Sequence, residues 1–295
     1  MDTASLKTFM SIADSGSFTT AAEQLYLTQP AISKRIQALE SELGARLFDR
    51  VGRQTLMTPA GEIFYKRAQI ILQQLEDSLR EIDNLSGEVA GTLHIGTSHH
   101  IGLHHLPPIL KRLNQQYPEL TLDIHFMDSE AAYREVHSGN LELGIITIPS
   151  TPEQELNSRI IWQDQLDFVV GKNHALAVER SHTIAMTPKI LSQYDAILPA
   201  KNTYPRHILE AAFEKLGDKI NTTLSTNYLE TIKAMIQNGL GWGVLPESMI
   251  DDSLHRLKIK GVKMERHLGV LLHASRTLSS PVNALLETLK NSDRL

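Results

Sequence analysis

The sequence contains no cysteine, which excludes a disulfide framework, a thiolate metal site and a cysteine nucleophile. It also has no run of about 18 apolar residues, so we expect no membrane-spanning helix. Its first residues, MDTASLKTFMSIADSGSF, lack a basic start followed by an apolar stretch and do not look like a signal peptide. The expected compartment is therefore the cytoplasm.

Positive charge is scarce too. The 295 residues carry a formal net charge of −5, and residues 1–58 hold six Lys and Arg against six Asp and Glu. Any binding of nucleic acid must then depend on where the cations sit, not on bulk charge. The Gly-x-Ser-x-Gly elbow, the phosphate loop and the His-Glu-x-x-His helix are also missing, and we expect no enzyme activity.

The remaining composition is that of a globular protein. With 41% hydrophobic and 21% charged residues the chain can bury sizeable cores, and its length suits two or three domains. Residues 1–58 read as three short helices, over 3–16, 17–25 and 28–44, followed by a hairpin around Gly52.

The third of these helices has two different faces. At about 100° per residue, its isoleucines and leucines gather on one side, opposite Gln29, Ser33 and Lys34. Pro30 is tolerated because the first N–H groups of a helix have no intrahelical partner. Gln29 can pair with adenine, Pro30 can touch a thymine methyl, and Lys34 can reach guanine or a phosphate; Gln37 adds a second amide. This pattern indicates a groove-reading face; an ordinary solvated helix face is the alternative.

The chain from Pro59 to about Ser86 predicts one long helix with apolar residues at heptad-like spacing. Such a helix favours pairing with a second copy, and packing on its own chain is the alternative. A glycine-containing linker, SGEVAG, follows over 86–91. Beyond it, strands and helices alternate, which is typical of open parallel-sheet domains that bind ligands at the carboxyl ends of their strands.

The N-terminal region resembles the signature of LysR-type transcriptional regulators, in register from Phe9 to Gly61 without a gap. The matching residues are Phe9, Gly16-Ser17-Phe18, Ala21-Ala22, Leu25, Gln29-Pro30-Ala31, Ser33, Leu39-Glu40, Leu43-Gly44, Leu47-Phe48, Arg50, Thr58 and Ala60-Gly61. The order of the later segments also fits this family.

The resemblance implies an α+β multidomain chain with three parts. These are a winged helix-turn-helix over 1–58, a dimerisation helix over 59–87, and a two-lobed α/β effector domain like a periplasmic binding protein over 88–295. Lobe 1 would span about 91–161 and 266–295, and lobe 2 about 162–265. The implied partners are inverted-repeat double-stranded DNA, a small and anionic effector, further copies of the chain in a homodimer or homotetramer, and RNA polymerase; no cofactor is expected.

In that family the helix that begins at Gln29 enters the major groove. By the same resemblance Arg53 makes a minor-groove contact from the wing, while Arg50 flanks the wing or pairs with Glu40 or Asp49. Ser17 and Thr28 serve as helix caps and phosphate contacts. The predicted DNA-binding residues are Ser17, Thr28, Gln29, Pro30, Ser33, Lys34, Gln37, Arg50 and Arg53.

The effector site is predicted where strands end and helices begin. The segment GTSHHIG offers hydroxyls and imidazoles beside free N–H groups, and the segments IITI, AKNTYPR and LSTNYLE add polar groups that include Arg206 and Asn227. The candidates are Thr97, Ser98, His99, His100, Thr147, Asn202, Thr203 and Thr226. Capping of local backbone is the alternative role for each hydroxyl.

By resemblance, Ser98, Thr147 and Thr203 match positions that hold a small anion in the cysteine-regulon type of member. His100 stands where a small polar residue is more common. Among His99, His100, His104 and His105, the pair His100 and His104 has the i,i+4 spacing that clamps zinc or nickel. The sequence shows no third ligand beside them, so metal sensing is the alternative interpretation of this segment.

Overall fold

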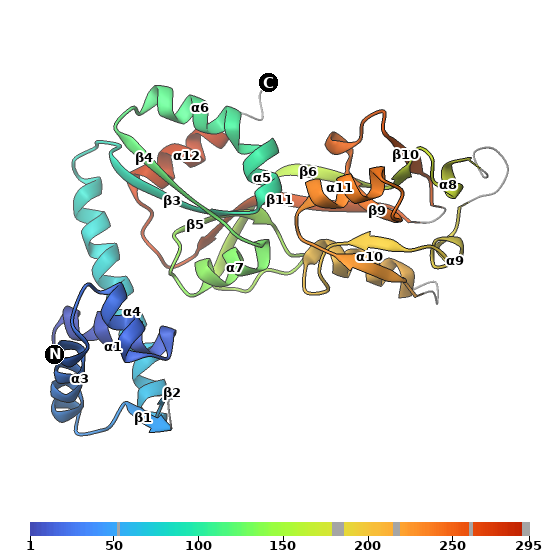
Figure 1. Ribbon diagram of the computed structural model, residues 1–295. Helices are drawn as coiled ribbons and strands as arrows, with labels where there is room; N and C mark the ends of the chain where they lie inside the picture. The colour runs from blue at the N-terminus through green and yellow to red at the C-terminus, as the bar shows by residue number, and fades with distance from the viewer. Residues whose placement is uncertain (52–53, 179–185, 215–218, 260–261, 291–295) are drawn as a thin grey trace. The chain divides into compact units, whose positions relative to one another are not determined.

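The structure is a computed structural model that describes residues 1–51, 54–178, 186–214, 219–259 and 262–290. It divides into two compact units, Met1–Ser86 and Gly87–Leu295 (Figure 1). None of the described helices is long and apolar enough to cross a membrane.

The first unit begins with three short helices, α1 (Thr3–Ser15), α2 (Phe18–Gln24) and α3 (Gln29–Leu43). Each starts at a residue whose side chain accepts a hydrogen bond from a free N–H group of the first turn, at Asp2, Ser17 and Thr28. Left-handed glycines, Gly16 and Gly44, end the first and the third. The predicted breaks between helices therefore follow from local capping chemistry.

A hairpin follows, formed by β1 (Phe48–Val51) and β2 (Gln54–Met57) in antiparallel pairing. The Oε1 atom of Glu40, on α3, accepts hydrogen bonds from the N–H groups of Leu47 and Phe48 at 2.7 and 3.3 Å. This carboxylate ties the start of the hairpin to α3. The hairpin therefore belongs to the same small folding unit as the helices.

The core of this unit is centred on Phe9, whose ring lies 5.2 Å from that of Phe48 and 4.9 Å from that of Phe64. Phe64 belongs to α4 (Pro59–Asn84), a single helix capped by Thr58. Its first turn packs very closely on the hairpin: a Cβ atom added to Gly61 would lie 2.2 Å from the carbonyl oxygen of Leu47. Only glycine fits at this contact.

The second unit is built on a nine-stranded sheet in the order β4-β3-β5-β11-β6-β9-β7-β8, with β10 paired to β6. Figure 1 shows two lobes side by side along this sheet. Lobe 1 contains β3 (Gly91–Thr97), α5 (His99–His104), α6 (Leu106–Gln116), β4 (Leu120–Phe126), α7 (Ser129–His137), β5 (Leu143–Thr147) and α12 (Ser280–Lys290). Lobe 2 contains α8 (Ala175–Val178), α9 (Pro188–Leu191), β7 (Ala196–Leu198), α10 (Tyr204–Glu214), β8 (Thr222–Ser225), α11 (Leu229–Gln237), β9 (Trp242–Pro246), the 3-10 turn η1 (Glu247–Met249) and β10 (Leu254–Leu257).

Two long strands, β6 (Leu156–Gly171) and β11 (Met264–His273), run through both lobes. They pair antiparallel over the whole length of β11, with one register shift between Leu268 and Gly269. The backbones are in close contact at this bulge, where a Cβ on Gly269 would lie 2.2 Å from the carbonyl oxygen of Arg159. The lobes are thus joined by paired backbone rather than by a loose linker.

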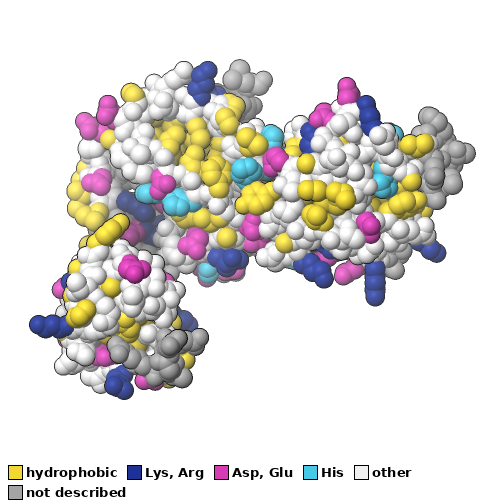
Figure 2. All heavy atoms as spheres, in the orientation of Figure 1, with side chains coloured by type: hydrophobic (Ala, Val, Ile, Leu, Met, Phe, Trp, Pro, Cys, Tyr) yellow, Lys and Arg dark blue, Asp and Glu magenta, His cyan; other side chains and the backbone are white. Residues whose placement is uncertain are grey.

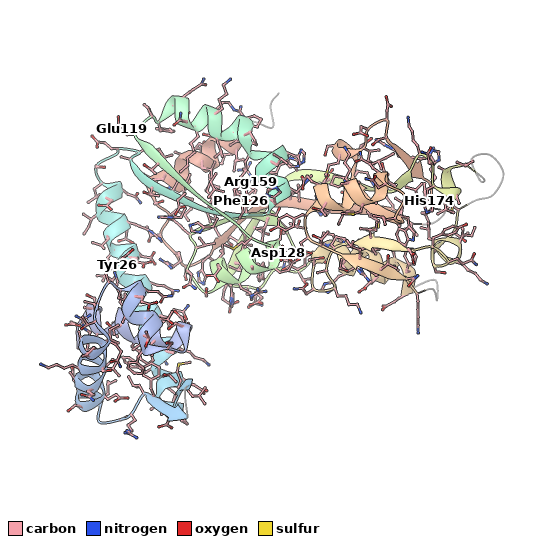
Figure 3. The ribbon with its side chains drawn as sticks, viewed as in Figure 1. Tyr26, Glu119, Phe126, Asp128, Arg159 and His174 are labelled. Carbon is pink, nitrogen blue, oxygen red and sulfur yellow. The ribbon has the colours of Figure 1, made fainter. Side chains whose placement is uncertain are left out.

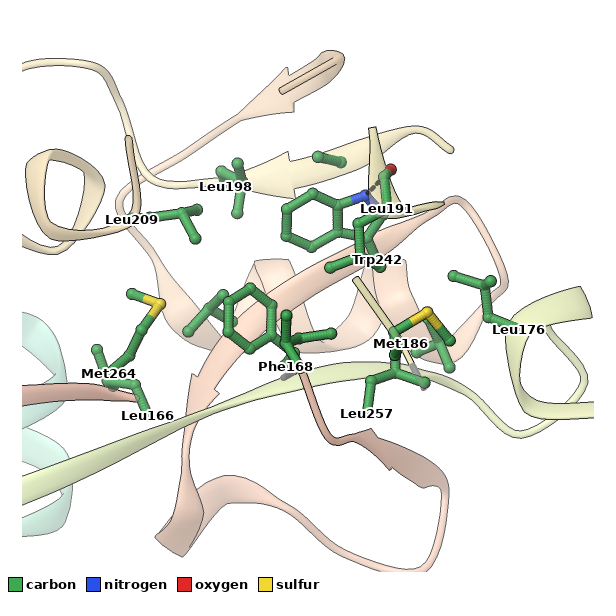
Figure 4. Packing of buried hydrophobic residues seen from close by; sticks show 14 of the residues in the cluster. Leu166, Phe168, Leu176, Met186, Leu191, Leu198, Leu209, Trp242, Leu257 and Met264 are labelled. Atoms are coloured by element: carbon green, nitrogen blue, oxygen red, sulfur yellow. Dashed lines mark hydrogen bonds between the residues drawn. The ribbon is translucent and has the colours of Figure 1, made fainter. Parts of the chain in front are cut away.

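Each lobe has its own hydrophobic core. In lobe 1, β3, β5 and β11 bury Ile95, Leu143 and Val270 under the helices. In lobe 2 the core surrounds Trp242, whose indole Nε1–H donates to the carbonyl oxygen of Leu191 at 3.0 Å (Figure 4). Separate cores allow each lobe to behave as a rigid body.

The contact at Gly61 gives a first prediction. Gly61→Ala gains helix propensity of about 1 kcal/mol, but the new Cβ would overlap the Leu47 carbonyl, and overpacking costs about 1–3 kcal/mol. Because backbone at 2.2 Å cannot be accommodated without a shift, we expect net destabilisation. Hydrogen exchange of the full chain should show faster exchange in β2 and the first turn of α4. The exposed neighbour variant Glu62→Ala should leave this exchange near the parent's; unchanged or slower exchange in Gly61→Ala contradicts the packing argument.

Candidate nucleic-acid interface and ligand pocket

Helix α3 presents the two faces that the sequence predicted. Ile32, Ile36 and Leu39 are buried in the core of the first unit. On the other side Pro30, Lys34 and Gln37 are exposed, whereas Gln29 and Ser33 are half-buried. Their side chains are linked, since the Nε2 atom of Gln29 donates to the Ser33 hydroxyl at 3.0 Å. This bond orients the amide at the start of the helix while its oxygen stays available as an acceptor.

The hydroxyls of Ser17 and Thr28 act as helix caps. They accept hydrogen bonds from the N–H groups of Thr20 and Ala31, at 3.3 and 3.4 Å. A hydroxyl that accepts in this way still has its own proton to donate, and a phosphate oxygen is a suitable acceptor beside a helix N-terminus. Capping and phosphate contact are therefore compatible in these two residues.

The two wing arginines are placed only in part. Arg53 lies outside the described residues, and Arg50 is described only as a member of β1, paired in register with Thr55. Glu40, one of the two partners predicted for Arg50, has its Oε1 atom engaged by the backbone of Leu47 and Phe48. A minor-groove role for Arg53 stays a prediction.

Tyr26 is a surface residue that the sequence did not single out as a contact. It lies between α2 and α3 with φ at 54°, and its side chain is 96% exposed. A left-handed conformation costs a non-glycine residue about 1–2 kcal/mol, so this turn is destabilising at Tyr26. Its phenol stands in the loop that leads into α3, where a tyrosine hydroxyl can donate to a phosphate. The sequence could have indicated this residue, because Tyr26 is a bulky side chain in a turn where glycine would be favoured.

Helix α4 carries a row of exposed apolar side chains along its length. They are Ile63, Ile70, Ile71, Leu75, Leu79 and Ile82, and the exposed Leu85 follows directly after the helix. A row of this kind is costly to leave in water and marks a surface that meets a partner. The spacing from Leu75 to Leu79 to Ile82 is that of a coiled-coil seam.

The second unit has a cavity of about 390 Å³ between its lobes. Its walls come from the carboxyl ends of the parallel strands β3, β4 and β5 in lobe 1, and from the residues that follow β7 and β8 in lobe 2. The lining residues are Ser98, His99, His100, Phe126, Met127, Asp128, Ser129, Glu130, Ala131, Thr147, Pro199, Thr203, Pro205, Asn227, Tyr228, Leu229 and Arg266.

Five of the eight predicted effector residues line this cavity, namely Ser98, His99, His100, Thr147 and Thr203. The other three lie beside it. The Thr97 hydroxyl donates to the Ile145 carbonyl inside the sheet at 2.7 Å, Asn202 is exposed in a turn, and the Thr226 hydroxyl accepts from the N–H of Tyr228.

Two of the lining hydroxyls also satisfy nearby backbone. Ser98 accepts a hydrogen bond from the N–H of Ile101, and Thr203 donates to the carbonyl oxygen of Ala200. Arg206, which the sequence also offered as a cleft residue, is instead buried in lobe 2 and bonded to Glu210, Pro199 and Thr222.

The sequence missed the acidic part of the lining, Asp128 and Glu130, and its one arginine, Arg266. Asp128 follows the end of β4 almost at once, so the strand-end rule that found Ser98 and Thr147 could have found it as well. The same rule could not find Arg266, because this residue lies within β11 and not after the end of a strand. It reaches the cavity because β11 pairs antiparallel with β6.

Three polar contacts join the lobes across this cavity or beside it. The Asn227 amide donates to Asp128 at 2.8 Å, the N–H of Tyr204 donates to Glu130 at 2.5 Å, and His104 lies 3.1 Å from Glu230. Asp128 and Phe126 are labelled in Figure 3 at the end of lobe 1 that faces lobe 2. In lobe 1 these contacts come from the start of α7 and the end of α5, and in lobe 2 from the starts of α10 and α11.

The charges around the cavity are not those of a simple anion site. Arg266 is 6% exposed, and its Nε and Nη2 atoms lie 2.6 and 2.5 Å from one oxygen of Asp164. This pairing offsets the only guanidinium of the lining, while Asp128 and Glu130 remain. Burial raises the pKa of Glu130, and burial lowers the pKa of His100 to about 2, with the charge of Arg266 adding to the effect. The His100 ring is therefore neutral at physiological pH.

A capped tri-helical head with a wing, joined to a two-lobed domain with a cavity at its strand ends, defines a ligand-controlled DNA-binding regulator. Comparison with known families identifies which kind. Residues 3–62 match the bacterial regulatory helix-turn-helix model of the lysR family, and residues 86–294 match the LysR substrate binding domain. The chain belongs to the LysR family and is a DNA-binding transcription regulator with an effector domain, not an enzyme.

Individual relatives agree with this assignment. An uncharacterized regulator of Azotobacter vinelandii is 56% identical over 108 residues, which are 37% of this chain and 75% of the relative. A probable RuBisCO transcriptional regulator of Cyanophora paradoxa is 29% identical, with 96% of this chain and 90% of the relative aligned. A full-length OxyR variant of Pseudomonas aeruginosa has the same fold at 23% identity, with a TM-score of 0.70 over 98% of this chain and 95% of that chain. CbnR bound to its target DNA is similar at 18% identity, with a TM-score of 0.63 over 99% of this chain and 100% of that chain.

Proposed function

We propose that this regulator reads DNA through the exposed face of α3 and binds a small organic effector between its two lobes. The observation that carries the DNA role is the division of α3 into a buried apolar face and a polar face led by the linked Gln29 and Ser33. Lys34 and Pro30 extend that face toward the base edges of a major groove. Ser17, Thr28 and Tyr26 supply phosphate contacts that set the register.

The family membership supports further proposals about partners. The operator is an inverted repeat, because paired copies of the head present two α3 helices. RNA polymerase is a further partner, and the cytoplasm is the compartment of action. No cofactor is proposed beyond the effector itself.

The DNA role predicts the effect of Lys34→Ala. Loss of the ammonium should weaken binding to an operator fragment, recovered by selection from genomic DNA, by about 1–3 kcal/mol if Lys34 reads a base. If it contacts a phosphate, the loss should be uniform across sequences and the salt dependence should fall by about one charge. Fluorescence anisotropy at two salt concentrations distinguishes these outcomes. Lys7→Ala removes an exposed cation of α1 and serves as the control; parental binding in both Lys34→Ala and Gln29→Ala would exclude α3 as the reading helix.

The apolar row on α4 supports homodimerisation through this helix, with dimers pairing further into a homotetramer. Burying such a row against a second copy recovers about 25 cal/mol for each Å² of apolar surface removed from water. Leu75 and Leu79 lie near its middle.

Replacing both leucines with glutamine should therefore lower the molar mass of the protein in solution, as measured by sedimentation velocity. Lys66→Gln places the same side chain on another exposed part of α4 and should leave the mass unchanged. An unaltered mass in the Leu75→Gln, Leu79→Gln double variant would show that assembly uses another surface.

For the effector, the cavity supports a small organic acid that also carries hydrogen-bond donors. Thr147, which the sequence predicted as an anion contact, suits an acidic group, and the N-terminus of α7, which the sequence did not predict, adds free N–H groups. Asp128 and Glu130 would repel a ligand that is only negative, but they accept bonds from a hydroxyl or ammonium group. The proposed ligand thus differs from a bare inorganic anion, and similarity to the cysteine-regulon type stays a prediction.

The three contacts between the lobes suggest how this ligand acts. A ligand that engages Asp128 or Glu130 competes with Asn227 or with the Tyr204 backbone, and so changes the balance between closed and open lobes. Rigid lobes then pass this change to the assembly of subunits.

The effector proposal predicts a ranking of simple probes in calorimetry of the purified protein. Malate and serine, which combine an acid with a donor, should bind more tightly than sulfate or succinate. Thr147→Val should weaken that binding about tenfold, the value of one hydrogen bond to a charged group. Thr226→Val, just outside the lining, is the matched control. Equal or tighter binding of sulfate, or an effect of Thr226→Val but not of Thr147→Val, would refute this assignment.

A further inference from the structure

Helix α5 contains histidines whose arrangement the proposed effector site does not explain. His100 and His104 lie one helical turn apart on α5, and Glu230 faces them from α11 in the other lobe. One ligand atom from each of these three side chains lies within 4.8 Å of the others. Figure 2 shows histidine and acidic side chains together on the surface where the lobes meet. The cluster therefore spans the cleft.

Two of the three side chains have polar atoms without a partner. His100 is 4% exposed, and neither of its ring nitrogens has a hydrogen-bond partner among the described residues. The Oε2 atom of Glu230 is also buried and unbonded there, although its Oε1 atom lies 3.1 Å from His104. A buried polar atom without a partner costs about 1–3 kcal/mol. Because these atoms lie close together and come from both lobes, they indicate that an ion or a molecule binds between them.

The surroundings of this volume suit a cation. His105 packs its ring 5.5 Å from that of His100 and 4.9 Å from Trp162, which shields the site on one side. Arg266, whose charge acts on His100, is paired with Asp164, and an oxygen of Asp164 lies 3.8 Å from the Nε2 atom of His100. The guanidinium charge is thus largely compensated, and a carboxylate stands directly behind the ligand set.

We propose that His100, His104 and Glu230 bind one divalent transition-metal ion, of the zinc, cobalt or nickel class, between the lobes. Two imidazoles and one carboxylate are the donors that such ions take, and three protein ligands leave a fourth position for water or a bound molecule. A tetrahedral site needs ligand atoms about 3.3 Å apart at metal–nitrogen distances near 2.0 Å. The pair His104 and Glu230 already meets this spacing, and a ring nitrogen of His100 lies within 4.8 Å of both atoms, so a small adjustment would be needed to bring the third ligand to the ion.

The consequence is a link between the lobes that is stronger than a hydrogen bond. His100 also lines the effector cavity, so the ion would stand at its wall. An ion held by α5 and α11 together favours the closed arrangement, because opening the cleft separates Glu230 from the two histidines. This inference does not depend on the identity of the effector.

Two other clusters of the described residues do not support the same proposal. In the first, His94 and His125 both bond one oxygen of Asp123, at accessible positions of strands β3 and β4. The second joins His137 to Glu153 and Glu155 on the surface. In both, all three side chains are wholly or partly accessible to water and no buried nitrogen lacks a partner, so nothing there calls for an ion.

The test uses the full-length protein, freed of metal by a chelator and then dialysed. Titration with Co²⁺ should produce the visible absorption of a tetrahedral site, at one ion per chain, and Zn²⁺ should displace it. Glu230→Gln and His104→Gln keep the size of the side chains but remove a ligand. Each should weaken Co²⁺ binding by more than about tenfold, since even residues behind a metal ligand cost 10–100-fold.

A matched variant identifies the site. His94→Gln alters the exposed cluster and should leave the Co²⁺ titration unchanged. Failure of the parent protein to bind Co²⁺ or Zn²⁺ in the micromolar range overturns the proposal, and so does binding that survives Glu230→Gln or is lost in His94→Gln. DNA binding by each variant can be followed in the same samples, so that loss of the metal site is distinguished from loss of the regulator's fold.

Discussion

The second unit depends on one buried ion pair, between Asp164 on β6 and Arg266 on β11. These residues stand directly opposite each other in the antiparallel register of the two strands that run through both lobes. Both are nearly inaccessible to water, and breaking a pair of this kind leaves an uncompensated buried charge at a cost of about 3–5 kcal/mol. The pair therefore fixes the register where the lobes join, and with it the relative positions of the strand ends that form the cavity.

The same pair sets the electrostatics of the cleft. Because Asp164 neutralises the guanidinium, Arg266 contributes shape and hydrogen-bond direction more than positive charge. Asp128 and Glu130 then dominate the lining, and each is held by a contact from the opposite lobe. Asp128 and Glu130 thus both line the cavity and accept the hydrogen bonds that join the lobes, so the proposed ligand would compete with these contacts.

Sequence reasoning succeeded where local chemistry decides the structure. The caps at Ser17 and Thr28, and the apolar side of α3, follow from rules that act within one helix. The structure contains all three features. The strand-end rule likewise located Ser98 and Thr147 at the cavity. The strand-end rule failed for Thr97. This residue is still part of β3, and its hydroxyl points into the sheet and donates to the Ile145 carbonyl.

What could not be read from the sequence are contacts between residues far apart in the chain. The histidine pair on α5 was visible as an i,i+4 spacing, but its acidic partner lies 126 residues later. Glu230 reaches His104 only because the start of α11 comes near the end of α5, where the two lobes meet across β6 and β11. The third ligand is therefore supplied by the tertiary structure, and the residues next to His100 and His104 in the sequence give no indication of it.

Helix α5 is where these constraints meet. Its first residues, His99 and His100, form part of the cavity wall, and its last residue, His104, reaches the other lobe. The helix has only six residues, so these two places are about one turn apart. A ligand that displaces α5 as a whole would alter the contact of His104 with Glu230, and the proposed ion would restrain the helix by holding this contact. The proposed effector and the proposed ion would therefore influence each other through this one helix, without a relay through the core of either lobe.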